Sequence, residues 1–166
     1  ITDRGDASGT GWWSSRKNKY VQEVLDHPLV GLKQSMLPQV LQPNEIAGKL
    51  NNDAAEWTGL RVGIPVACGT GDNAAAALGL AVKPGTPVIS LGTSGTAYTL
   101  SLKAPADVSG QVFAHASASG EHLPLTCTLN ATLAVDNIAR MLSLDRLAVA
   151  DQTRVVVMPY LSGERL

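Results

Sequence analysis

The segment Gly69–Asn73 places a carboxylic acid directly after a glycine turn. It follows an apolar run, Arg61–Ala67, and precedes the small, helix-forming residues 74–80. An acid at such a strand-to-helix junction lies near the helix N-terminus, where the helix dipole favours its ionised form. The carboxylate of Asp72 could therefore take a proton from a substrate hydroxyl, which is general-base chemistry. The alternative interpretation is that Asp72 only caps the helix, because aspartate is a common N-cap residue.

A second polar turn, Ser90–Thr96, combines two glycines with several hydroxyl residues. Successive N–H groups in such a turn can form an anion-binding nest, and hydroxyls add donors to phosphate oxygens. The turn lacks the Gly-Lys-Ser/Thr ending of a Walker A loop. The alternative is an ordinary hairpin in which the glycines supply positive φ angles.

The N-terminal segment Thr2–Thr10 holds acids and hydroxyls in a glycine-rich stretch. These residues could line a polar ligand pocket, but a loop braced by Asx-type turns is the favoured interpretation. The tripeptide Arg4-Gly5-Asp6 also matches an integrin-binding motif, although three residues are weak support for adhesion. Glu164 and Arg165, which follow the last apolar run, are expected to make only a structural loop interaction.

The histidines do not show the spacing of a metal site. None of His27, His115 and His122 has a partner at ligand spacing, and the chain has no Cys-x-x-Cys pair. We therefore assign no metal ligand to the protein itself.

Apolar patterning predicts alternating strands and helices around these polar turns. Short helices are expected within residues 20–58, with Asn44 as one N-cap, and residues 1–15 are expected to be irregular. Further along the chain, the patterns predict the strand Arg61–Ala67, a hairpin of Pro87–Leu91 with Thr96–Leu100, a loop over 103–121, the strand His122–Thr128, a helix over Asn130–Leu144 capped by Asn130, and the strand Thr153–Leu161. This alternation indicates an α/β fold with a mixed sheet, and the hairpin suggests a domain boundary near residue 85.

The bulk properties exclude several classes of protein. The chain has 166 residues, of which 45% are hydrophobic and 16% charged, and its net charge is -1. That balance gives no footprint for nucleic acid or for an anionic membrane surface. No apolar run approaches the roughly 20 residues that span a bilayer, and no signal-peptide pattern opens the chain. A cytoplasmic location is therefore expected, and both ends of the chain suggest an excised segment of a larger protein.

Five blocks, in this order, resemble the FGGY carbohydrate kinases and within them the bacterial xylulokinases. The blocks are Thr2–Ser14, Gly71–Ala75, Val88–Thr96, Cys127–Asn130 and Pro159–Arg165. The resemblance implies an α/β, actin/hexokinase-like (ribonuclease H-like) two-domain kinase fold that this chain contains incompletely. Residues 1–84 would be the latter part of the sugar-binding domain, and residues 85–166 would begin the nucleotide-binding domain.

The same resemblance implies an activity and a set of site residues. The kinase would transfer the γ-phosphoryl group of ATP, with Mg²⁺, to the 5-hydroxyl of D-xylulose. Asp72 would be the catalytic base and would bind the sugar together with Asn73. Gly92, Thr93, Ser94 and Gly95 would face the phosphates. The isolated segment is expected to be inactive, and a homodimer is common in the family. Ribulokinase, gluconokinase and glycerol kinase activities stay open as alternatives, as does a non-catalytic actin-like module.

Overall fold

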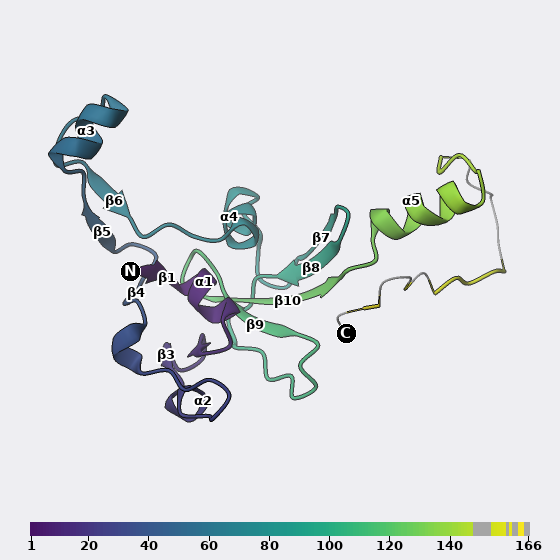
Figure 1. The fold of residues 1–166 in the computed structure, drawn as a ribbon, viewed down its shortest axis with the longest axis horizontal. Coiled ribbons are helices and arrows are strands. Elements are labelled where there is room, and N and C mark those ends of the chain that lie inside the picture. Colours follow the sequence, from purple (N-terminus) through teal and green to yellow (C-terminus); the bar gives the residue numbers. More distant parts are fainter. Residues whose placement is uncertain (148–153, 159, 161–162, 165–166) are drawn as a thin grey trace.

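The computed structural model describes residues 1–147, 154–158, 160 and 163–164 (Figure 1). Its largest sheet has four strands in the order β7-β8-β10-β9, and every neighbouring pair is antiparallel. The strands are β7 (Pro87–Leu91), β8 (Gly95–Thr99), β9 (Phe113–Ala116) and β10 (His122–Thr128). The predicted hairpin is confirmed, since Leu91 pairs with Gly95 next to the connecting turn.

The strand β9 was not expected, because residues 103–121 read as a polar loop. Phe113–Ala116 pairs with His122–Leu125 of β10, so the strand is specified by its partner and not by its own pattern. The prediction of a loop is therefore wrong at these four positions.

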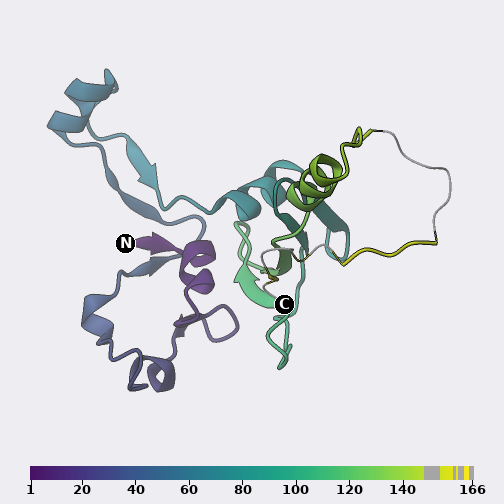
Figure 2. The same cartoon turned by 45° about the vertical axis from the view of Figure 1, so that its right-hand side comes forward.

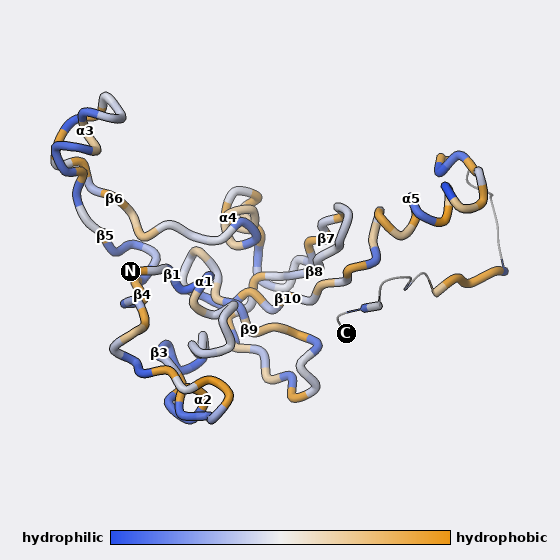
Figure 3. The backbone as a smooth tube through the Cα atoms, in the orientation of Figure 1, coloured by the Kyte–Doolittle hydropathy of each residue, from blue (hydrophilic) through white to orange (hydrophobic). Residues whose placement is uncertain are grey.

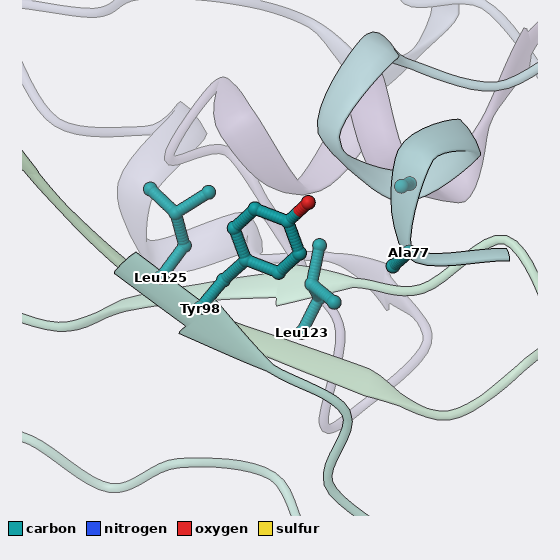
Figure 4. Packing of buried hydrophobic residues seen from close by; sticks show 5 residues of the cluster. Ala77, Tyr98, Leu123 and Leu125 are labelled. Atoms are coloured by element: carbon teal, nitrogen blue, oxygen red, sulfur yellow. The ribbon is translucent and has the colours of Figure 1, made fainter. Parts of the chain in front are cut away.

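One face of the sheet packs against the helix α4 (Asp72–Gly79). Figure 4 shows Tyr98, Leu123 and Leu125 rising from this face toward the helix. Each of these side chains is at most 6% exposed. The helix contributes Ala74 and Ala77, whose small side chains let its backbone approach the sheet. Full burial of one leucine side chain is worth about 1.5–3 kcal/mol, so this contact stabilises the position of α4.

The first residues form regular structure, which corrects the expectation of an irregular segment. The strand β1 (Thr2–Asp3) pairs in parallel with β4 (Val40–Leu41), a segment that had been predicted as helical. The helix α1 (Arg4–Gly9) follows, and the Asp3 carboxylate caps it by accepting the N–H groups of Gly5 at 2.7 Å and Asp6 at 3.1 Å. An Asx-type interaction was correctly anticipated here, but its product is a helix.

The helix α1 joins the N-terminal elements to the large sheet. The Ser8 hydroxyl accepts the N–H of Ala116 in β9 at 2.9 Å, and the Ser15 hydroxyl donates to the carbonyl of Ala114 at 2.7 Å. Trp13 packs with Ala7 and Ala116 in a second small core, as expected for a buried tryptophan. The remaining elements of this part are β2 (Trp13–Ser14), β3 (Lys19–Tyr20), α2 (Gln22–Leu25) and a 3-10 helix, η1 (Gln34–Met36).

A two-stranded ribbon carries the helix α3 (Asn52–Thr58) away from the large sheet, as Figures 1 and 2 both show. Its strands are β5 (Ile46–Lys49) and β6 (Pro65–Ala67), which are antiparallel. Two predictions are wrong here. Asn44 does not start a helix, because Ile46 pairs with Ala67, and β6 is exposed where a buried strand was expected. The helix begins later, where the Asn51 side chain accepts the N–H of Ala54 at 2.9 Å.

The C-terminal helix α5 spans Thr132–Met141, within the predicted range. Its N-cap is Ala131 without a side-chain bond, so the assignment of that role to Asn130 is wrong. Residues 154–158 have no regular structure, which contradicts the predicted strand there; the rest of that strand lies mainly outside the described residues. The tube of this stretch is coloured mainly as hydrophobic in Figure 3, and Val156 is 87% exposed. Within the described residues, no helix has the length and apolar character needed to cross a bilayer.

Candidate active site

A pocket of about 370 Å³ opens where α1, the start of α4 and the strands β9 and β10 meet. Its polar side chains come from three separate parts of the chain: Asp6 and Thr10, Asp72 and Asn73, and His115. Gly5, Gly9 and Gly71 line it as well, so backbone is accessible to a bound molecule. The pocket is therefore rich in groups that can bind hydroxyls.

Asp72 is the first residue of α4, and the N-cap is Gly71. The Oδ1 atom of Asp72 accepts the N–H of the adjacent Asn73 at 2.6 Å. The alternative that Asp72 serves as the N-cap is therefore wrong, and the exposed carboxylate faces the pocket. Asn73, the other predicted sugar-binding residue, lines the same pocket.

Asp6 is a second carboxyl group of the pocket, and it comes from the segment Thr2–Thr10, whose acids and hydroxyls were considered as a possible pocket lining but interpreted mainly as a loop. Its Oδ1 would lie 2.8 Å from a Cβ atom on Gly71, so the residue before Asp72 must be small for Asp6 to keep its place. Burial raises the pKa of Asp6 above its ordinary value, and the neighbouring Asp3 acts in the same direction. The charge of Asp72 raises the pKa of Asp6 further.

His115 is the pocket residue that sequence reasoning missed. It sits on β9, half-buried, with its Cε1 atom only 3.2 Å from the position of a Cβ atom on Gly9. Burial lowers the pKa of His115, and the Asp6 carboxylate opposes that effect. The neutral imidazole is thus favoured, and it can donate or accept one hydrogen bond in the pocket. The sequence pattern that pointed to Asp6 is a polar side chain directly after a glycine, at Gly5 and again at Gly9. No local pattern marked His115.

The same helix argues against adhesion through Arg4-Gly5-Asp6. Arg4 is only 6% exposed, its Nε donates to Asn18 at 3.2 Å, and its guanidinium lies 5.8 Å from the centre of the Trp13 ring. A buried arginine cannot present this tripeptide to a receptor.

The predicted phosphate loop lies apart from this pocket. The loop runs from Gly92, just after β7, to Gly95, the first residue of β8. None of its four residues lines the pocket. Neither glycine has a positive φ, which contradicts the alternative that they serve an ordinary turn through positive φ. Gly95 instead allows a close approach, because a Cβ atom there would lie 3.1 Å from Thr128 and 3.3 Å from Ala131.

No group of three or more His, Cys, Asp or Glu side chains able to hold a metal ion occurs within residues 1–147 or the shorter described stretches.

Comparison with known proteins shows which family the chain resembles. Residues 1–79 match the N-terminal domain of the FGGY family of carbohydrate kinases. The xylulose kinase of Streptomyces rubiginosus is 56% identical over 164 residues, which cover 99% of this chain and 33% of that protein. Among solved structures, a kinase from Brucella ovis superposes with a TM-score of 0.86 at 30% identity, covering 99% of this chain and 36% of the other. The xylulose kinase from Bifidobacterium adolescentis gives 0.77 at 34% identity, with the same coverage of 99% and 36%.

The chain thus spans about a third of the length of the curated relatives that it matches. Its α/β architecture is that of the actin/hexokinase-like sugar-kinase fold, of which it contains a part. The family match and the high identity over nearly the whole chain lead to one conclusion: residues 1–79 belong to the N-terminal domain of the FGGY family of carbohydrate kinases, and the chain as a whole is similar to xylulose kinases.

Proposed function

We propose that this chain is the middle part of an ATP-dependent kinase that phosphorylates D-xylulose to D-xylulose 5-phosphate. The observation that carries the proposal is the pocket in which Asp72, Asn73 and Asp6 converge. The resemblance to two proteins named xylulose kinase, over 99% of the chain in each case, supports this choice of sugar. A non-catalytic module would not need an acid exposed at this helix start.

In this proposal Asp72 is the general base. As the 5-hydroxyl oxygen of the sugar attacks the γ-phosphorus of ATP, its proton passes to the Asp72 carboxylate. The new oxygen–phosphorus bond forms while the bond to the departing ADP breaks. Asn73 and Asp6 hold other sugar hydroxyls, so the protein contributes mainly positioning and charge. Proton transfer to a positioned side chain contributes about 10²–10⁴-fold to a rate.

The loop Gly92–Gly95 is proposed to face the phosphates of ATP. The N–H of Gly92 donates to the carbonyl of Ser94 at 2.9 Å, so this group closes the turn and does not bind phosphate. The hydroxyls of Thr93 and Ser94 are exposed and suited to phosphate oxygens. Mg²⁺ is proposed to arrive with ATP, because it prefers phosphate oxygens and water to a cage of protein ligands.

We also propose a division between two domains near residue 84. The match to the family's N-terminal domain ends at residue 79, and the β7–β8 hairpin begins at Pro87. Residues 1–84 would then supply the sugar pocket, and residues 85–166 the beginning of the nucleotide-binding domain.

The test is sugar-dependent ATP turnover by the full-length kinase that contains this chain. We expect D-xylulose to be preferred over L-ribulose, gluconate and glycerol, and Asp72→Asn to lower kcat by about 10²–10⁴-fold. If the wild-type kinase turned over another sugar and Asp72→Asn did not, the proposed mechanism would stand and the proposed substrate would be wrong. An active Asp72→Asn protein, or no turnover with any of the four, would refute the proposal.

A further inference from the structure

The carboxylate of Glu164 binds a turn at residues 128–132, which is more than 30 residues earlier in the sequence. Glu164 accepts the N–H of Leu129 at 2.8 Å and the side-chain amide of Asn130 at 3.0 Å. It also accepts the Thr128 hydroxyl. The Asn130 amide donates to the carbonyl of Gly163 at 2.8 Å, so two of the family-like blocks are joined by several bonds.

The turn that Glu164 holds lies directly against the predicted phosphate loop. The methyl group of Thr128 would be 3.1 Å from a Cβ atom on Gly95, so the two segments are in close contact. At the end of the turn, Thr132 donates to the carbonyl of Gly92 twice, from its hydroxyl at 2.6 Å and from its backbone N–H at 3.0 Å. The loop is thus fixed from one side by residues 128–132.

We infer that Glu164 is a positioning residue that sets the phosphate loop for ATP through the turn at residues 128–132. The role assigned to Glu164 is positional, without a contact to the nucleotide. The inference rests on the proposed function, because it assigns ATP to the loop Gly92–Gly95. Hydrogen bonds to a charged acceptor are stronger than neutral ones, and three donors share this single carboxylate. Loss of the carboxylate therefore releases the turn and, with it, the loop.

The experiment measures two dissociation constants by calorimetry on the full-length kinase: one for a non-hydrolysable ATP analogue with Mg²⁺, and one for D-xylulose. In Glu164→Ala we expect the Kd for the nucleotide to rise about tenfold or more, with the Kd for D-xylulose within about twofold of wild type. Glu164→Gln retains one acceptor oxygen, so its nucleotide Kd should lie between those of wild type and Glu164→Ala. Thr132→Val, which removes a bond to Gly92, should weaken nucleotide binding selectively as well.

Asp136→Asn is the matched control. Asp136 is also an acid of this region, on α5, but it forms an exposed ion pair with Arg146 at 2.5 Å. We expect both of its dissociation constants to match wild type. An unchanged nucleotide Kd in Glu164→Ala, or an equal rise for sugar and nucleotide, would overturn the inference while leaving the proposed function intact. Wild-type protein that binds D-xylulose but not the nucleotide would overturn both.

Discussion

The missing side chain of Gly71 links the backbone before Asp72 to the pocket. Its φ of -69° is accessible to any residue, so conformational freedom is not the reason for a glycine here. A side chain would instead collide with the Asp6 carboxylate at 2.8 Å. The glycine therefore allows two acids from distant parts of the sequence to share one pocket.

Gly71→Ala tests this role directly. The added methyl group must displace Asp6, which we propose to bind a sugar hydroxyl, so the KM for D-xylulose should rise about tenfold while the KM for ATP stays unchanged. The measurement is steady-state kinetics of the full-length kinase.

Gly79→Ala is the control for Gly71→Ala, because it lies at the other end of α4, where the added Cβ meets no described atom within 4 Å beyond its own helix backbone and chain neighbours. Alanine there should leave both KM values unchanged and favour the helix by up to about 1 kcal/mol. Equal effects of the two substitutions would contradict the role given to Asp6.

At the scale of elements, β10 is the strand on which the site depends most. It pairs with β8 on one side and β9 on the other, and it supplies Leu123 and Leu125 beneath α4. The strand was predicted from its apolar pattern with the observed ends, His122–Thr128. Its partner β9, which bears His115, was not predicted, because its short pattern is not distinct from a loop and the pairing decides it.

Leu123→Ala should lower the free energy of unfolding by about 2–5 kcal/mol, since this side chain is only 1% exposed. Leu133→Ala removes the same atoms from a side chain that is 46% exposed and should have a much smaller effect. Thermal unfolding of the two variants of the full-length kinase, followed by circular dichroism, compares them. Similar losses of Tm would mean that the packing under α4 does not stabilise this region.

At the scale of the whole molecule, the described chain leaves much apolar surface uncovered. Ile89 and Leu91 of β7 are 69% and 72% exposed, and they belong to a sheet with α4 on its other side. The chain also spans only about a third of the length of the curated relatives that it matches. Both observations favour a site that is completed by further protein.

We therefore expect the 166 residues alone to show no D-xylulose-dependent ATP consumption. A coupled assay of ADP release, run beside the full-length kinase at equal concentration, makes the comparison. Turnover by the isolated chain at a rate near that of the full-length protein would refute this expectation.

The sequence by itself determined the strongly patterned elements and the order of the polar turns. The β7–β8 hairpin, β10, α5 and the helix after Asp72 follow from local periodicity and turn residues, which act over a few positions. Tertiary structure decided the rest. The segments 2–3, 40–41 and 46–49 became strands because partners were available, against their local patterns. Asp6, Asp72 and His115 meet only because α1 packs on β9 beside the start of α4. Such a meeting depends on contacts between residues up to about a hundred positions apart, and no local pattern can encode it.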